Sequence, residues 1–277
     1  MSDRETDAQL RLDISVALGK VSYFHNIVAV GPGVCRVCRG PALDSQLCTR
    51  CQATEETLGG ATCDHTFFLA YADGQNPGGW SQSAQTMRLY KDKPPTELCV
   101  EHVHELTYVV TWLHDPCMRA ADGGWDAAAY VPSRTPREGL HPVTGIARNV
   151  SRLSADDPAS GGPHKIKRVA LEPGPVNVSR VANSARFAVP DKWRPRVEGK
   201  RVLLVDDTWA TGTSIQSAAA ALKAAGAVSV TGLCVARWLG WDWESHIPLL
   251  ERVTAKPYDP FNCFAGTHRC RLSSQHG

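Results

Sequence analysis

One stretch, from Val202 to Ser214, limits the fold of this chain more than any other part of the sequence. It opens with four apolar residues, Val-Leu-Leu-Val, which indicate a short strand buried inside a parallel sheet. Two adjacent acids, Asp206 and Asp207, come next, and we expect the strand to end there. Small residues then lead into a predicted helix that starts near Ile215 and has Gly226 at the position of its C-cap. Because ligands of open α/β sheets bind at the carboxyl ends of strands, this order predicts a binding site.

The loop in this stretch has the chemistry of a phosphate site. Unpaired amides at a helix N-terminus, together with the helix dipole, attract anions, and a glycine lets the backbone approach them closely. The candidate residues are Ala210, Thr211, Gly212, Thr213 and Ser214. The carboxylates of Asp206 and Asp207 suit a sugar diol or hydrated Mg²⁺. In the alternative interpretation, the acids only close the strand and Ser214 is the N-cap of the helix.

The same stretch resembles the motif with which type I phosphoribosyltransferases bind 5-phosphoribosyl-1-pyrophosphate (PRPP). The resemblance implies an α/β fold with a parallel sheet flanked by helices. It assigns the ribose hydroxyls to Asp206 and Asp207 and the 5-phosphate to the loop 210–214, with Mg²⁺ accompanying PRPP. Ala210 stands where purine-salvage members carry an aspartate that acts as acid and base, and Thr208 and Trp209 replace aliphatic residues. These departures argue against a hypoxanthine-guanine enzyme and leave the catalytic residue unassigned.

Two Cys-x-x-Cys pairs near the amino terminus predict a zinc module. The four cysteines are Cys35, Cys38, Cys48 and Cys51. Each pair brings two thiolates to one side of a tight turn, and two pairs complete a tetrahedral Zn²⁺ site without an open position. Such a site is structural, because metal binding stabilises a module that is too small for a core of its own. A redox dithiol is the alternative, although it needs only one pair.

Further segments follow the order seen in the ComF-like branch of the superfamily. They include Tyr90-Lys91, a short strand from Ala127 that ends in Val131-Pro132, and a loop that bears arginines. In the superfamily, the loop after this strand contacts pyrophosphate, and the guanidinium fork suits its oxygens. The candidate pyrophosphate ligands are Arg134, Arg137 and Arg180. Ordinary solvated surface arginines are the alternative.

Charge and hydropathy narrow the class of protein. The formal net charge is +2, which is too small for a protein that binds nucleic acid by bulk charge. We find no apolar stretch near the roughly 20 residues that span a membrane, and the polar first residues predict neither a secretory signal nor a transit peptide. We therefore expect a cytoplasmic protein. In that compartment thiols stay reduced, so the ten cysteines should not form disulfides.

The remaining cysteines give weaker signals. Cys234 lies in an apolar run and is expected in the core. A second metal site that joins the C-terminal segment to the region of Cys99 is a further hypothesis. Its candidate ligands are Cys63, Cys99, His102, Cys263, His268 and Cys270. Taken singly, each of them is expected to be a buried thiol or a surface histidine instead of a metal ligand.

The chain divides into four predicted parts. These are an extension with one helix (1–34), the zinc module (35–60), a phosphoribosyltransferase-like domain (61–240) and a tail containing Trp and Cys (241–277). Residues 154–175, rich in Gly, Pro, Asp and Ser, predict a loop, either a lid or an insertion without a role. The three tryptophans at 238, 241 and 243 either close a core or interface or stack on a nucleobase.

Two functions follow from these features. In the first, an enzyme transfers the phosphoribosyl group of PRPP to an unidentified nitrogen acceptor and releases pyrophosphate. In the second, a non-catalytic ComF-like protein binds PRPP or DNA, and its zinc module contacts single-stranded DNA or a protein partner through Arg36, Arg39 or Arg50. The resemblance also implies a homodimer, because dimers are common in the superfamily.

Overall fold

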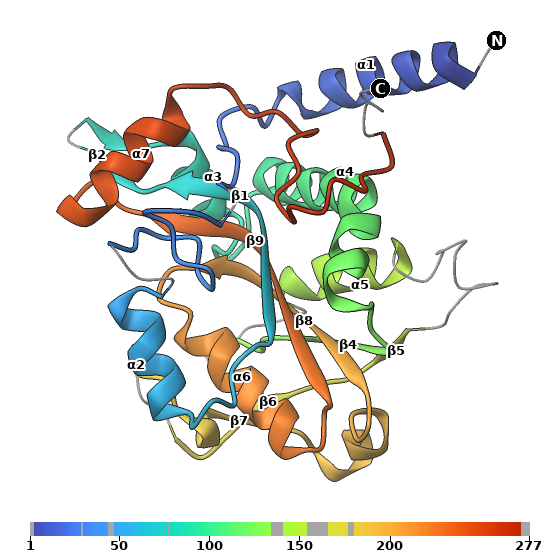
Figure 1. The fold of residues 1–277 in the computed structure, drawn as a ribbon, viewed down its shortest axis with the longest axis vertical. Helices are drawn as coiled ribbons and strands as arrows, with labels where there is room; N and C mark the ends of the chain where they lie inside the picture. The colour runs from blue at the N-terminus through green and yellow to red at the C-terminus, as the bar shows by residue number, and fades with distance from the viewer. Residues whose placement is uncertain are drawn as a thin grey trace.

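The computed structural model describes residues 3–28, 30–43, 47–76, 78–133, 141–153, 166–176 and 180–272. At its centre lies a five-stranded, wholly parallel sheet (Figure 1). In spatial order its strands are β1 (His65–Asp73), β9 (Ser229–Leu239), β8 (Arg201–Trp209), β4 (Ala127–Tyr130) and β5 (Lys167–Arg168). Two short antiparallel pairs accompany it, β2 (Gln75–Asn76) with β3 (Gly79–Trp80) and β6 (Glu172–Pro173) with β7 (Phe187–Ala188).

Helices fill the connections between the strands. The α-helices are α1 (Asp3–Gly19), α2 (Thr49–Thr57), α3 (Gln82–Leu89), α4 (Glu97–Asp122), α5 (Val143–Leu153), α6 (Thr213–Ala224) and α7 (Ile247–Thr254). The described residues also include the 3₁₀ helices η2 (Ser184–Arg186), η3 (Asp191–Arg196) and η4 (Glu244–His246). Among the described residues, no helix is both long and apolar enough to cross a bilayer.

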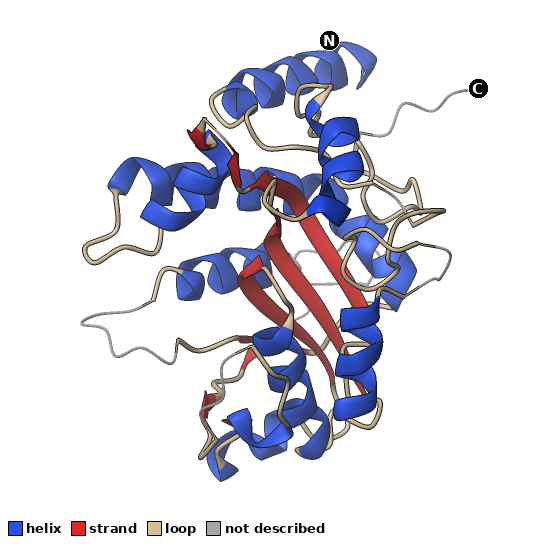
Figure 2. Ribbon diagram, turned by 90° about the vertical axis from the view of Figure 1, so that its left-hand side faces the viewer, coloured by secondary structure: helices blue, strands red, loops and turns tan. Residues whose placement is uncertain are grey.

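Helices cover both faces of the sheet (Figure 2). On β9, the hydroxyl of Thr231 donates a hydrogen bond to Asp122, at the end of α4. The next residue, Gly232, lies against the Ile215 side chain of α6. Because successive residues of a strand face opposite sides, α4 and α6 lie on opposite faces. The predicted fold class is therefore confirmed.

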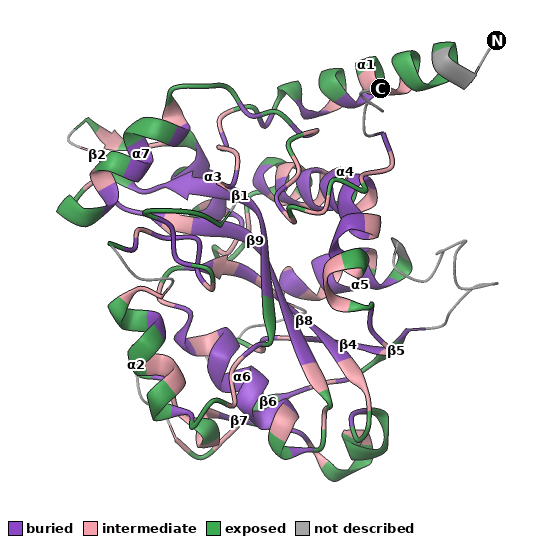
Figure 3. Ribbon diagram, in the orientation of Figure 1, coloured by how far each residue is buried: buried purple, intermediate pink, exposed green. Residues whose placement is uncertain are grey.

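The core lies in the central strands. Val202, Leu203, Leu204 and Val205 of β8 are wholly buried. Figure 3 shows the buried colour over much of the central strands. A strand covered on both faces needs apolar residues at every position, which explains the continuous apolar run. The predicted strand, helix and strand around this run are thus present as β8, α6 and β9.

The bounds of β8 differ from the expectation. The strand continues past the two acids to Trp209, so the prediction that it ends at Asp206 and Asp207 is wrong. The reason is its neighbour, since β9 offers partners as far as Arg237, which pairs with Trp209. The helix begins at Thr213, and Gly226 follows its C-cap in the left-handed conformation, with φ of 92°.

The segment that carries the amino-terminal cysteines packs on the sheet. His25 and Tyr71 of β1 exchange both backbone hydrogen bonds. The Tyr71 hydroxyl also donates to the carbonyl of Arg39 at 2.7 Å, and the Thr66 hydroxyl donates to the carbonyl of Val37. The cysteine turns are thereby held against the edge strand β1.

Candidate functional site

Asp206 and Asp207 lie near the carboxyl end of β8. The amide of Asp207 donates to Oδ1 of Asp206 at 2.9 Å. Asp207 is buried and Asp206 half-buried. Burial and the neighbouring Asp207 raise the pKa of Asp206 to about 8, because two adjacent carboxylates resist ionising together. A cation or a hydroxyl-rich ligand would favour the ionised form.

A lysine from a distant segment meets this acidic edge. Nζ of Lys91, just after α3, lies 2.6 Å from Oδ1 of Asp207. Burial alone would lower the pKa of Lys91, but the charge and hydrogen bond of Asp207, aided by Asp206, raise it overall. Lys91 belongs to the Tyr90-Lys91 segment noted in the sequence, but no pattern there pairs it with Asp207.

The loop after β8 closes on a tryptophan. Gly212 is the N-cap of α6 and has φ of 79°, in the left-handed region that favours glycine. A Cβ at this position would overlap the indole of Trp209. Trp209 is buried and meets the Phe68 ring edge-on, with centroids 5.3 Å apart. The indole therefore fixes the path of the loop and is not available for stacking on a ligand.

Hydroxyls gather at the first turn of α6. Thr211 Oγ1 and Thr213 Oγ1 are 3.1 Å apart, and Arg186 Nη2 donates to Ser214 Oγ at 3.3 Å. Because Gly212 is the N-cap, the alternative in which Ser214 caps the helix is wrong. The loop thus combines a helix N-terminus, three hydroxyls and a guanidinium, which is a donor set suited to a phosphate.

Of the three predicted pyrophosphate ligands, the described residues include Arg180 alone. Arg134 and Arg137 lie outside the described residues. Arg180 is exposed, with φ of 61°. Arg186 reaches the loop through Ser214, and sequence reasoning missed it. The sequence could have indicated Arg186, because it lies in the segment that precedes Gly199-Lys200 and the start of the central strand.

The four amino-terminal cysteines form one cluster, as predicted. Their sulfur atoms all lie within 4.8 Å of one another, and Cys38 Sγ is 3.7 Å from Cys48 Sγ. In a tetrahedral site with Zn–S bonds of about 2.3 Å, the sulfurs are about 3.8 Å apart. The amides of Gly40 and Cys48 each donate to a cluster sulfur at 3.3 Å. Geometry and donor set therefore fit a structural metal ion.

Arg237 connects this cluster to the loop after β8. Its guanidinium is buried and donates from Nε to the carbonyl of Cys38 at 2.7 Å. Nη1 donates to the carbonyls of Trp209 and Ala210, both at 3.2 Å. Gly40 leaves room for it, since a Cβ there would overlap Nη2. One side chain thus bonds to both the cysteine turn and the start of the candidate phosphate loop.

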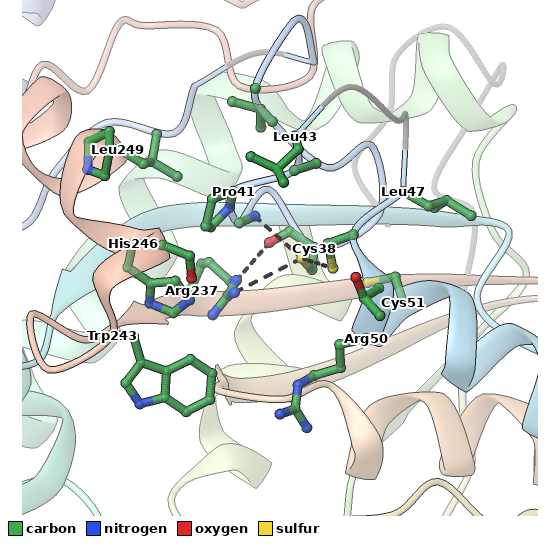
Figure 4. A pocket seen from close by; sticks show the side chains of 18 of the residues that line it. Cys38, Pro41, Leu43, Leu47, Arg50, Cys51, Arg237, Trp243, His246 and Leu249 are labelled. Atoms are coloured by element: carbon green, nitrogen blue, oxygen red, sulfur yellow. Dashed lines mark hydrogen bonds between the residues drawn. The ribbon is translucent and has the colours of Figure 1, made fainter.

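A cavity of about 900 Å³ opens between the cysteine turns, the loop and α7. Figure 4 shows Trp243 and Arg50 on one side of it and Leu43 and Leu249 on the other. Ala210 and Thr211 contribute to its wall. The cavity is therefore continuous with the candidate phosphate loop.

His246 adds a neutral polar group to this wall. Its Nδ1 accepts from the amide of Gly240 at 3.1 Å, so Nε2 carries the proton. Burial, followed by the nearby charge of Arg237, lowers the pKa of His246 to about 4. The Trp243 ring lies 5.0 Å from the imidazole.

The other tryptophans of the predicted cluster do not line this cavity. Trp238 packs on Trp80, with ring centroids 5.8 Å apart. Trp241 Nε1 donates to Oδ2 of Asp73 at 3.4 Å. Only Trp243, 46% exposed, is placed among the lining residues, so the three tryptophans have different roles.

No family model and no curated protein sequence matches the chain. Among solved structures, it is similar to the glutamine PRPP amidotransferase of B. subtilis complexed with ADP and GMP (18% identity, 47% of this chain, 26% of that chain, TM-score 0.29). It is also similar to a structure of the allosteric regulatory enzyme of purine biosynthesis (17% identity, 47% of this chain, 26% of that chain, TM-score 0.27). A third similar structure is a phosphoribosyltransferase from Corynebacterium diphtheriae (22% identity, 58% of this chain, 95% of that chain, TM-score 0.29). The chain spans about a quarter of the length of the first two. With TM-scores this low, function has to be inferred from the site itself.

Proposed function

We propose that the chain binds PRPP at the carboxyl end of β8 and transfers its phosphoribosyl group to a nitrogen acceptor. One observation carries the proposal: the pair Asp206 and Asp207 is followed by helix α6, whose N-cap is Gly212 and whose N-terminal hydroxyls and helix dipole suit an anion. The spacing places a diol acceptor and a phosphate donor set on one short segment. The two sets match the ribose and the 5-phosphate of PRPP.

In this proposal the two acids and the loop bind different parts of PRPP. Asp206 and Asp207 accept hydrogen bonds from the ribose hydroxyls, while the loop and Arg186 hold the 5-phosphate. The bond between C1 of the ribose and pyrophosphate breaks as the acceptor nitrogen bonds to C1, and a proton of that nitrogen passes to solvent. Mg²⁺ supplies charge neutralisation to pyrophosphate when bound. The protein contributes positioning and electrostatic stabilisation.

The acceptor enters the cavity beside Ala210 and Thr211 in this proposal. Trp243 offers an aromatic surface, and the neutral imidazole of His246 offers a hydrogen-bond donor. A planar nitrogen heterocycle or an aromatic amine suits such a wall. We infer that the four-cysteine cluster holds zinc. Arg237, which also lines the cavity, connects this cluster to the cavity wall through its hydrogen bond to the carbonyl of Cys38.

Calorimetry with PRPP and Mg²⁺ tests the donor site. The native chain should bind PRPP, and the double variant Asp206→Asn/Asp207→Asn should lose binding. Asp191→Asn is the control, because its side chain is 99% exposed on η3 and should leave binding unchanged. Equal binding by the double variant and the native chain would refute the donor site.

A screen for pyrophosphate release, with nucleobases and amines as acceptors, tests transfer. PRPP binding without release in any mixture would favour the non-catalytic alternative. DNA binding through the zinc module has less support, because Arg39 is buried and only Arg36 and Arg50 of the three arginines are exposed. A shift of single-stranded DNA that Arg36→Ala abolishes would reverse that preference.

A further inference from the structure

A second group of metal-ligating side chains lies where the C-terminal segment crosses helix α4. The group consists of His114, Cys117, Cys263 and Cys270, and one ligand atom of each lies within 4.8 Å of the others. Within the described part of the chain, such convergence occurs only here and at the amino-terminal cysteines. Three thiolates and one imidazole are a common ligand set of structural zinc sites.

Helix α4 supplies two of the four ligands from one face. His114 and Cys117 are buried and three residues apart, so they lie one above the other. Pro116, between them, has no N–H, and the carbonyl of Trp112 therefore lacks its usual helical partner. Arg271 Nε of the C-terminal segment donates to that carbonyl at 2.8 Å. The carbonyl that Pro116 leaves unpaired within the helix thus binds the segment that carries the other two ligands.

The distances between ligand atoms are slightly shorter than the edges of a tetrahedral site and far longer than a disulfide bond. Cys117 Sγ lies 3.2 Å from Cys270 Sγ and 3.6 Å from Cys263 Sγ, and His114 Nδ1 lies 3.2 Å from Cys270 Sγ. A zinc tetrahedron has S–S edges of about 3.8 Å and S–N edges of about 3.6 Å, given its bond lengths. A disulfide would need about 2.05 Å, and all three thiols are free.

The imidazole already has the orientation of a metal ligand. His114 Nε2 donates to the carbonyl of Pro260 at 2.8 Å. This bond leaves the lone pair of Nδ1 directed toward Cys270, as in metal sites where the second ring nitrogen donates to a backbone carbonyl. The Phe264 ring, with its centroid 4.8 Å from that of His114, covers the site. The bond to Pro260 and the cover of Phe264 both come from the C-terminal segment.

This arrangement corrects the candidate ligands from the sequence. Cys263 and Cys270 are included, but Cys99 is at the other end of α4, about 27 Å from Cys117 at the rise of an α-helix. His102 Nδ1 instead pairs with the Tyr23 hydroxyl at 2.9 Å.

Two other candidates also lie outside the group. His268 is exposed, and Cys63 is buried against β9, with its amide donating to Gln216 at 2.7 Å. The sequence pointed to the C-terminal cysteines but not to their partners on α4, since His114 and Cys117 are hidden in a long helical pattern.

We propose that His114, Cys117, Cys263 and Cys270 bind a zinc ion that fastens residues 259–272 to α4. With four protein ligands the site is closed, so its role is structural. The proposal does not depend on PRPP binding, and the fastened segment lies on the α4 side of the sheet.

Elemental analysis of the full chain, purified with zinc present, tests the site. The native protein should hold two zinc ions, one for each group. Cys270→Ser and, separately, Cys48→Ser should each reduce the content to one. His268→Asn is the matched control, because His268 belongs to the same loop, has φ of 52°, which asparagine tolerates, and should leave both ions bound. Unchanged zinc in Cys270→Ser, or a Cys117–Cys270 disulfide in a non-reducing peptide map, would overturn the proposal.

The first of two further measurements uses the native chain alone, so it holds even if Cys270→Ser folds poorly. Cobalt titration of the native chain should give a thiolate charge-transfer absorption for seven thiolates at saturation, and a plateau at four would overturn the second site. Trypsin should cleave after Arg269 and Arg271 much faster in Cys270→Ser than in His268→Asn. Equal cleavage rates would exclude the fastening role.

Discussion

Lys91 Nζ lies 2.6 Å from Asp207 Oδ1, and this pair joins the segment after α3 to the carboxyl end of the central strand. The lysine balances one of two adjacent acids, while the other, Asp206, has a raised pKa. The acidic edge therefore carries little net charge before a ligand arrives. A ligand that brings hydroxyls and a divalent cation would favour ionisation of both acids.

Lys91→Met should destabilise the protein by about 2 kcal/mol. The substitution leaves the Asp207 carboxylate, only 6% exposed, without its partner, although the 38% exposure of Lys91 makes the loss smaller than for a fully buried pair. Urea unfolding measures the change. Lys93→Met, at an exposed position of the same loop, should cost less.

A double variant separates this charge effect from lost packing. Because Asp207→Asn removes the unpaired charge, Lys91→Met should cost clearly less in its background. Equal costs in the two backgrounds would mean that the ion pair contributes nothing to stability.

Asp206→Asn should change how stability depends on pH. The folded protein holds the pKa of Asp206 at about 8, above its ordinary value of 3.8, so the folded state binds more protons than the unfolded state between these values. The native protein therefore loses stability as the pH rises toward 8, and the loss levels off above it. The melting temperature of Asp206→Asn, relative to the native protein, should rise over the same interval.

The exposed Asp191→Asn should follow the native pH curve and serves as the control. A constant difference between Asp206→Asn and the native protein across this interval would show that Asp206 titrates normally.

The sequence predicted the elements of the core because their signals are local. The apolar run at Val202 and the small-residue loop before α6 are continuous in sequence, and each specifies its own structure. The end of β8 could not be predicted in the same way. Whether Asp207 belongs to the strand depends on how far β9 extends beside it, which is a property of a distant segment.

The side chains that complete the sites were harder to predict for the same reason. Lys91, Arg186 and Arg237 reach the acids, the loop and the cysteine turn only after the sheet has formed. Cysteine pairs close in sequence, such as Cys35 and Cys38, give a spacing signal. His114 and Cys117 meet the C-terminal cysteines from across the fold, so no spacing identifies the full ligand set.

Gly212→Ala should cost much more stability than Gly199→Ala. Both glycines have a left-handed backbone, with φ of 79° and 67°, so each substitution carries a strain of about 1 kcal/mol. At Gly199 the new methyl group meets open space, whereas at Gly212 it overlaps Trp209. Urea unfolding should show the difference, and PRPP titration should show weaker binding only for Gly212→Ala. Equal losses of stability would mean that the indole does not constrain the loop.

Arg237→Met should weaken two sites at once. The buried guanidinium satisfies the carbonyls of Cys38, Trp209 and Ala210, and removing it leaves them without that donor, at a cost of about 1–3 kcal/mol for each group left unsatisfied. We expect faster loss of zinc from the amino-terminal cluster to a chelator, together with weaker PRPP binding. Arg194→Met, at an exposed position of η3, should change neither. If Arg237→Met loses zinc faster but binds PRPP as tightly as the native chain, Arg237 stabilises the cysteine turn alone and does not couple it to the loop.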